Sequence, residues 1–164
     1  MAAVSSGTAT VTLPTDTQIQ ITREFDAPKH LVYKAWTTPD LVKRWWHANL
    51  GEMTTCEIDL RVGGTWRYVM VVEGGLEVGF HGEYREIVPN ERLVSTEVYE
   101  GIPHADAHAA LDTLTLTEVD GRTTLTILVE HPTNEGRDAH INSGMEGGMQ
   151  AAMDLLEEVA VSLR

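Results

Sequence analysis

The fold is decided by the last stretch of the chain, His131–Arg164, which reads HPTNEGRDAHINSGMEGGMQAAMDLLEEVAVSLR. Apolar residues recur in it at steps of three or four, a spacing that places them on one face of an α-helix. These residues are Ile141, Met145, Met149, Met153, Leu156, Ala160 and Leu163. Asp154, Glu157 and Glu158 fall on another side, as expected of a face in contact with water. The sequence therefore predicts a long C-terminal helix with one buried face.

Three glycines, Gly144, Gly147 and Gly148, stand near the start of this predicted helix. Each costs about 0.5–1 kcal/mol of helix stability relative to alanine. A helix accepts that cost where another group must approach its backbone or where space must be left. We therefore expect the helix to lie over a curved sheet, with an apolar hollow at the glycine end.

Length and composition restrict the classes of protein to consider. A chain of 164 residues fits a single domain. Its formal net charge of −13 argues against binding to nucleic acid or to an anionic membrane surface. Cys56 is the single cysteine, so no internal disulfide is possible. Residues 1–17 do not resemble a signal peptide, and no apolar run is long enough to span a membrane, so a cytoplasmic location is expected.

The N-terminal half begins with a segment of low complexity. Residues 1–16 are rich in Ala, Ser, Thr and Val and are expected to form a flexible tail, with one domain over residues 17–164. Thr17–Phe25 alternates as a strand does, with Arg23 on the same side as the apolar residues. Pro28 and Pro39 each open a short helix, because proline is tolerated in the first helical turn.

Six further strands are expected between the two short helices and the long one. Glycine-rich or Pro-Asn turns separate most of them, and Asp120-Gly121 is a strong hairpin signal. The predicted strands are Met53–Val62, Thr65–Val72, Glu77–Val88, Arg92–Tyr99, Asp112–Val119 and Arg122–Glu130. Short connections favour antiparallel pairing. The sequence thus predicts an α+β fold in the order β-α-α-β6-α, with a seven-stranded curved antiparallel sheet around the C-terminal helix.

Several short motifs, in this order, resemble a known family. They are FDAPKHLVYKAWTTPDLVKRWW from Phe25, DLRVGG from Asp59, Phe80-x-Gly82-x-Tyr84, NERLV from Asn90 and GMEGG from Gly144. Together they resemble bacterial proteins similar to the C-terminal domain of the activator of Hsp90 ATPase, a group of the START-like or Bet v 1-like (SRPBCC) superfamily. The resemblance extends over residues 18–163. It implies a helix-grip fold with an internal cavity for apolar small molecules, and it does not imply one activity.

The predicted strands supply an aromatic inner wall. Trp66, Tyr68 and Met70 share one side of their strand, and Phe80 and Tyr84 share one side of the next. The charged residues lie on the opposite sides, so the aromatic sides should point toward the helix. With Trp36, Met145, Met149 and Met153 from the helices, these residues are predicted to bind the ligand. The simpler alternative is that the same side chains fill the core.

Glu97 is the candidate polar residue of the cavity. It shares a strand side with Leu93, Ser95 and Tyr99, so it would introduce a carboxyl group into an apolar site. Such a group finds a donor or becomes neutral through a raised pKa. It would then orient a ligand or act as a general acid or base. The alternative is that Val94, Thr96 and Val98 point inward instead.

Other polar residues are expected to be structural. His104, Asp106 and His108 lie in the long connection 100–111, which we expect to be a polar loop or a mobile lid rather than a metal site. Asp59 and Arg61 are predicted to form a salt bridge. The sequence contains no G-x-S-x-G, H-E-x-x-H or C-x-x-C motif, so no catalytic residue, metal or cofactor is predicted.

Three functions remain open from the sequence. The first is non-catalytic binding or carriage of a small hydrophobic or aromatic molecule. The second is an enzyme of the cyclase, aromatase or hydrolase type that acts on a hydrophobic substrate through a cavity carboxylate, which is an analogy at the level of the fold. The third is an Hsp90-type co-chaperone module, although the N-terminal domain of the eukaryotic activator has no counterpart in this sequence. A homodimer is left open as well.

Overall fold

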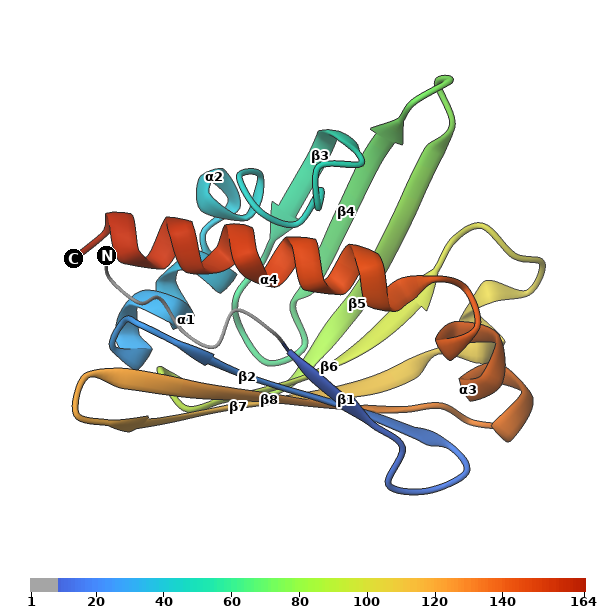
Figure 1. Ribbon diagram of the computed structural model, residues 1–164. Helices are drawn as coiled ribbons and strands as arrows, with labels where there is room; N and C mark the ends of the chain where they lie inside the picture. The colour runs from blue at the N-terminus through green and yellow to red at the C-terminus, as the bar shows by residue number, and fades with distance from the viewer. Residues whose placement is uncertain (1–8) are drawn as a thin grey trace.

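The computed structural model describes residues 9–164 and has one curved antiparallel sheet with α4 lying across its concave side (Figure 1). The strands are β1 (Thr10–Thr12), β2 (Gln18–Phe25), β3 (Gly51–Ile58), β4 (Thr65–Val72), β5 (Glu77–Val88), β6 (Arg92–Tyr99), β7 (Ala110–Val119) and β8 (Arg122–Glu130). Their order in the sheet is β1-β2-β8-β7-β6-β5-β4-β3, with every neighbouring pair antiparallel. The predicted helix-grip architecture is confirmed, with one strand more than expected.

The additional strand lies in the segment that was expected to be a flexible tail. β1 pairs with the outer edge of β2, with Val11 opposite Ile21. The side chain of Gln150 on α4 forms two hydrogen bonds with the backbone of Ala9. Its Oε1 accepts from the amide at 2.8 Å, and its Nε2 donates to the carbonyl at 2.7 Å. The expectation of a tail over residues 1–16 is therefore wrong for 10–12, and residues 1–8 lie outside the described part of the chain.

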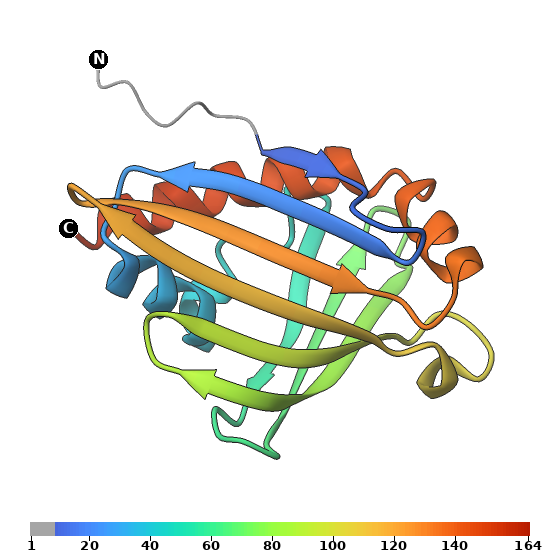
Figure 2. The ribbon, with the colours of Figure 1, turned by 90° about the horizontal axis from the view of Figure 1, so that it is seen from below.

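The helices gather on one side of the sheet and at one of its ends. They are α1 (Lys29–Thr37), α2 (Pro39–Val42), the 3₁₀ turn η1 (Ala105–His108), α3 (Asn134–Ile141) and α4 (Met145–Ser162). From below, the strands β2, β8, β7 and β6 lie in front, and α1, α2 and α4 lie behind them (Figure 2). Among the described residues, no helix combines the length and apolar character needed to cross a membrane.

The predicted C-terminal helix is two helices. Thr133 caps α3 by accepting a hydrogen bond from the amide of Gly136 at 3.0 Å. The chain then turns at 142–144, and Gly144 precedes α4 in the left-handed conformation, with φ +83°. Only glycine adopts this conformation without strain, so Gly144 begins a new helix rather than interrupting one. The prediction of one continuous helix from Ile141 is wrong at this turn.

The core lies between α4 and the inner face of the sheet. Its fully buried side chains include Ile19 and Phe25 of β2, Leu125 of β8 and Leu156 of α4. Arg23 lies among them, as the strand alternation predicted, and is 2% exposed. Its guanidinium contacts the carboxylate of Glu157 at 3.0 Å, and the prediction that Glu157 lies on the face in contact with water is wrong, because this ion pair holds it in the core. The inner face is therefore apolar except at a few defined positions.

Candidate functional site

A cluster of aromatic rings covers the inner face of β4 and β5. Trp66 and Tyr68 of β4 lie side by side, with ring centroids 4.8 Å apart. Trp46, which follows α2, contacts Tyr68 at 5.3 Å and Phe80 at 5.5 Å, both edge to face. Edge-to-face contacts are a favoured geometry for aromatic pairs. The strands β4 and β5 and the turn after α2 thus bring three of the predicted residues together around Trp46.

Glu97 lies on the inner side of the sheet and forms a pair with Asp112. Glu97 is opposite Ala110 of β7, a core residue, and Asp112 is two positions further along β7. The two carboxyl groups are hydrogen-bonded to each other. Burial raises the pKa of Glu97 above its ordinary value, and burial together with the Glu97 charge raises the pKa of Asp112 further. Two adjacent carboxyls shielded from water cannot both ionise easily, so ionisation of one opposes ionisation of the other.

The remaining predicted ligand-binding residues occupy different surroundings. Tyr84 and Met153 are buried in the core, and Met145 and Met149 pack against it while retaining exposed surface. Trp36 stacks on Trp45 at 4.8 Å. Met70 is buried beside Met53, its partner on β3, but stands outside the main core cluster of the described residues. The roles of all these residues in ligand binding stay predictions.

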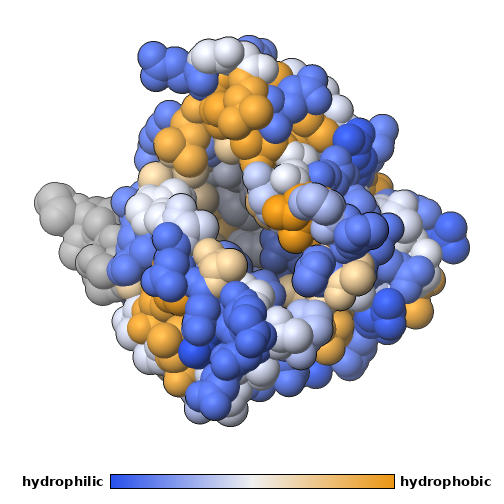
Figure 3. All heavy atoms as spheres, turned by 90° about the vertical axis from the view of Figure 1, so that its right-hand side faces the viewer, coloured by the Kyte–Doolittle hydropathy of each residue, from blue (hydrophilic) through white to orange (hydrophobic). Residues whose placement is uncertain are grey.

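Several side chains of the inner face keep accessible surface. Trp46, Phe80, Glu97, Asp112 and Met149 are only partly buried, although they lie between the sheet and the helices. A close-packed interior would leave such side chains with almost no exposed area. The space-filling view from the side of α3 shows a hollow near the middle of that face of the molecule (Figure 3). The partly exposed inner residues and this hollow indicate space between α4 and the sheet.

Two further hollows lie on the surface, near the connection between β6 and β7. One, of about 450 Å³, is lined by His81, Glu100 and residues 104–107. The other, of about 420 Å³, lies at the ends of β6, β7 and β8 and includes Ala110 and His131. Neither is lined by a residue that the sequence predicted to bind the ligand, and both are widely open to solvent. They therefore do not represent the predicted internal site.

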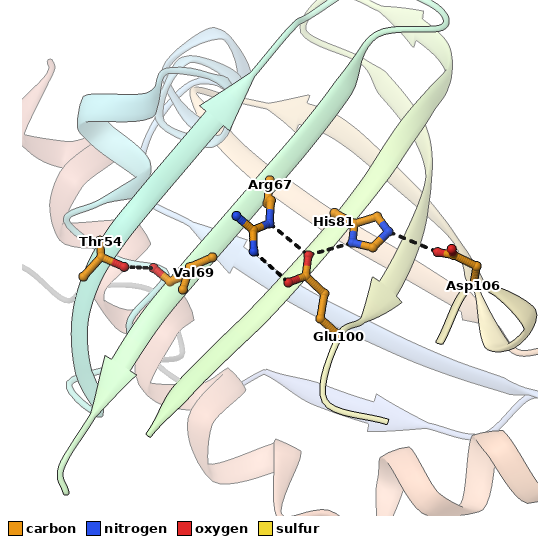
Figure 4. Close-up of polar contacts among 6 residues, drawn as sticks. All are labelled: Thr54, Arg67, Val69, His81, Glu100 and Asp106. Atoms are coloured by element: carbon orange, nitrogen blue, oxygen red, sulfur yellow. Dashed lines mark hydrogen bonds and ion pairs between the residues drawn. The ribbon is translucent and has the colours of Figure 1, made fainter. Parts of the chain in front are cut away.

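A polar network on the outer face holds the connection 100–109 against the sheet (Figure 4). Glu100 accepts two hydrogen bonds from Arg67 at 3.0 Å and contacts Nδ1 of His81 at 2.7 Å. Nε2 of His81 lies 3.2 Å from Oδ1 of Asp106 in η1. The hydrogen bonds from Arg67, followed by that from His81, lower the pKa of Glu100 to about 2. The connection predicted as a polar loop or a mobile lid is thus held to the sheet by polar contacts at Glu100 and Asp106.

Other polar residues, and the single cysteine, have structural surroundings. Arg61 donates to Asp59 at 2.9 Å, which confirms the predicted salt bridge. His131 and His140 contact each other at 3.0 Å, and burial, with a contribution from His131, lowers the pKa of His140 to about 4. Burial also raises the pKa of the Cys56 thiol to about 11, which makes it a poor nucleophile. Within residues 9–164, no group of three or more His, Cys, Asp or Glu side chains is arranged to hold a metal ion.

Sequence reasoning missed two residues of this site. Asp112 shares a strand side with Leu114 and Leu116, so the alternation in ALDTLTLTEV already placed a carboxylate on the core face. Trp46 lies in residues 43–49, which form turns after α2, and these turns direct its ring toward β4 and β5. The signal for Asp112 was present in the sequence, whereas the position of Trp46 depended on turns with no clear pattern.

Comparison with known protein families identifies the fold and its group. Residues 26–160 match the family described as "Activator of Hsp90 ATPase homolog 1-like protein". The chain belongs to this family. Its START-like fold commonly binds hydrophobic ligands, which agrees with a site on the concave side of the sheet. A search of curated proteins found no match.

Solved structures with the same architecture come from several bacteria. A crystal structure of a protein from Rhodobacter sphaeroides is similar with a TM-score of 0.86 and 28% identity, over 94% of this chain and 99% of that one. A solution structure of a protein from Arthrobacter aurescens has a TM-score of 0.82 and 24% identity, over 93% and 91% of the two chains. A protein from Nitrosomonas europaea has a TM-score of 0.78 and 23% identity, over 92% and 98%. The latter two support the fold alone.

Proposed function

We propose that this protein binds or carries a small hydrophobic or aromatic molecule between the sheet and α4, without altering it. The observation that supports this most is the partial exposure of Trp46, Phe80, Met145 and Met149 on the inner side of the molecule. A ligand that covers accessible apolar side chains in a concave site removes them from water. This burial favours binding by about 25 cal/mol per Å² of apolar surface.

The methionines suit an apolar ligand of irregular shape. Met145 and Met149 lie on the first turns of α4, on the same side as buried Met153. Unbranched thioether side chains adapt to differently shaped partners and make favourable contacts with aromatic rings. Opposite them, the rings of Trp46, Tyr68 and Phe80 provide flat apolar surface. A ring system held between these two walls is the ligand type that the arrangement favours.

A blocking substitution tests the proposal. Ser95 of β6 lies opposite Tyr84 and Asp112, on the inner side of the sheet. Ser95→Phe should fill the site and reduce binding of a naphthyl fluorophore at least tenfold, measured by fluorescence titration. Thr117→Phe places the same side chain at an exposed position of β7 on the alternate strand side and should leave binding unchanged. Equal binding by both variants, or no binding by the unsubstituted protein, would refute the proposal.

A second function, acid–base catalysis on a hydrophobic substrate, is favoured by the Glu97–Asp112 pair. A carboxyl group whose pKa is raised by burial and by a neighbouring carboxyl holds its proton more tightly than a free one, as a general acid requires. Native mass spectrometry of the purified protein, followed by analysis of any molecule that it releases, distinguishes the two functions. A carrier returns its molecule unchanged, whereas an enzyme converts it and loses this conversion on Glu97→Gln substitution.

A further inference from the structure

The register of the sheet places Trp66, Glu97 and Asp112 around a patch of small residues. Trp66 of β4 pairs with Gly82 of β5, and Glu97 of β6 pairs with Ala110 of β7. The pairs on either side of Gly82, namely His81 with Val98 and Tyr84 with Ser95, place Gly82 opposite Glu97. Glu97 thus has a glycine on one side and an alanine on the other.

The indole of Trp66 lies over Gly82. A Cβ atom added at Gly82 would be 2.5 Å from Nε1 of Trp66, so the N–H edge of the ring occupies the space that a side chain at Gly82 would need. Trp66 is 7% exposed. Its Nε1 donor therefore lies over Gly82, which is the neighbour of Glu97 on β5. Glycine inside a strand often marks such a close approach.

Two polar atoms at this place have no hydrogen-bond partner among the described residues. They are Nε1 of Trp66, which is a donor, and Oδ1 of Asp112, which is an acceptor, and both are buried. A buried polar group without a partner costs about 1–3 kcal/mol, so native structures rarely retain one without a reason. The two orphaned atoms lie on the same inner face and come from strands on either side of β5 and β6. They define what a ligand would have to supply: a donor for Asp112 and an acceptor for Trp66.

Among the described residues, no cationic side chain shifts the pKa of either carboxyl group of the pair. A neutral group, the phenol of Tyr68, lies near the pair. Burial, then the neighbouring Tyr84, Cys56 and Glu97, raise the pKa of Tyr68 well above its ordinary value, which places Tyr68 within electrostatic reach of Glu97. A buried carboxyl pair that shares a proton carries negative charge, and such a charge is stable only when a cation compensates it. The whole molecule, with a net charge of −13, also attracts cations and repels anions.

We propose that Glu97, Asp112 and Trp66 form the polar end of the ligand site and bind an apolar amine that carries a hydroxyl or carbonyl oxygen near its nitrogen. This inference rests on the proposed function, because the apolar body of the ligand occupies the same internal space. The ammonium group donates to Oδ1 of Asp112 and compensates the charge of the pair. The oxygen accepts from Nε1 of Trp66. Anionic molecules such as fatty acids are excluded, because their carboxylate would lie against the carboxyl pair.

Naphthyl probes that differ only in their polar group test the inference by isothermal titration calorimetry. In the unsubstituted protein, naphthylethylamine should bind about tenfold more tightly than naphthylethanol, as expected for one charge-assisted hydrogen bond. Naphthylacetic acid should not bind. The amino alcohol that combines both groups should bind more tightly than the amine. This comparison uses one protein, so it does not depend on whether a variant folds.

Substitutions then show which residues cause the preference for the amine over the alcohol. Asp112→Asn and Glu97→Gln should abolish the preference for the amine while the affinity for naphthylethanol changes less than about twofold. Trp66→Phe should remove only the advantage of the amino alcohol over the amine. Glu57→Gln makes the same replacement of a carboxyl by an amide at an exposed position of β3 and should retain every preference.

The outcomes separate this inference from the proposed function. Equal affinity for amine and alcohol, or a preference for the amine that survives Asp112→Asn, would overturn the inference and leave the apolar site intact. Absence of binding by every naphthyl probe would overturn the proposed function and the inference with it.

Discussion

Arg23 lies inside the molecule because two carboxylates of α4 reach it from the other side of the core. Glu157 is buried beside it at 3.0 Å, and Asp154 contacts it at 3.0 Å from a largely exposed position. Glu157 also accepts a hydrogen bond from the amide of Asp26 at 2.9 Å, which connects the end of β2 to the helix. This contact fixes α4 along the sheet and so sets the position of the helix over the site.

Removing the charge at Arg23 should therefore destabilise the folded protein. Arg23→Leu leaves Glu157 buried without its cation, and we expect the free energy of unfolding to fall by about 3–5 kcal/mol. Urea denaturation followed by circular dichroism measures this change. Arg61→Leu, which breaks only the exposed pair with Asp59, should cost less than about 1 kcal/mol. Similar losses for the two variants would contradict the structural role given to Arg23.

The Glu97–Asp112 pair should make the protein less stable as pH rises, whereas most carboxyl groups destabilise a protein as pH falls. Because the folded protein raises the pKa of Glu97 and Asp112, it binds their protons more tightly than the unfolded chain does. Their favourable contribution is complete below the unfolded pKa of about 4 and is lost as pH rises through the folded pKa values.

The double variant Glu97→Gln, Asp112→Asn should accordingly gain melting temperature relative to the unsubstituted protein as pH rises. The gain should be near zero at pH of about 4 and larger at pH of about 8, with about 2–4 °C for each kcal/mol. Differential scanning calorimetry across this range provides the test. A difference that is independent of pH would show that the two carboxyls titrate normally.

At the scale of elements, the turn between α3 and α4 was the least predictable feature of the fold. The apolar spacing from Ile141 to Met145 fits one continuous helix, so periodicity alone gave no sign of the break. The glycines were the signal, but glycine can mark a cap, a close approach or open space. Gly144 is a cap with positive φ, Gly147 has no atom within 4 Å of an added Cβ, and Gly148 lies near Leu50. The prediction that all three glycines lie within one helix was therefore wrong for Gly144, whereas Gly147 and Gly148 do lie in the first turn of α4.

For this reason, two alanine substitutions should change the free energy of unfolding in opposite directions. Gly144→Ala forces a side chain into the left-handed conformation and should lower the free energy of unfolding by about 1 kcal/mol. Gly147→Ala meets no atoms in an ordinary helical position and should raise it by about 0.5–1 kcal/mol. Thermal or urea denaturation of both variants checks the signs, and a stabilising Gly144→Ala would refute the cap.

The connection 100–109 is held by the contacts of Glu100 and His81. Glu100→Gln keeps the size of the side chain but removes the charge that Arg67 and His81 contact. We expect faster amide exchange in residues 101–109 and no change in β2 or β8, measured by hydrogen–deuterium exchange mass spectrometry. Because Arg67 and His81 lower the pKa of Glu100 to about 2, the unsubstituted protein should keep this protection until pH falls well below about 4. Unchanged exchange in Glu100→Gln would mean that other contacts hold the loop.

At the scale of the whole molecule, the sequence was sufficient for the architecture. Alternation in segments such as Arg122–Glu130 and short glycine turns predicted an antiparallel meander, and the register confirmed it. β1 was missed because three residues in a segment of small polar residues carry no periodic signal, and its position depends on β2 and Gln150. Individual residues of the candidate site could be predicted only where the alternation along a strand showed which side of the sheet they face, as for Trp66, Tyr68 and Glu97. The pairing of Glu97 with Asp112 depends on register between strands, which one sequence does not determine.

The central claim is that a ligand enters the space between the first turns of α4 and the aromatic wall of β4 and β5. Met145 and Met149 stand at that place and keep exposed surface, whereas Met153 is buried further along the same helix. The most direct measurement is the methyl NMR spectrum of protein labelled with ¹³C at its methionine methyl groups, recorded during titration with naphthylethanol. We predict large shift changes and ligand contacts at the methyl groups of Met145 and Met149. A spectrum in which both signals stay unchanged at saturating ligand would contradict the claim.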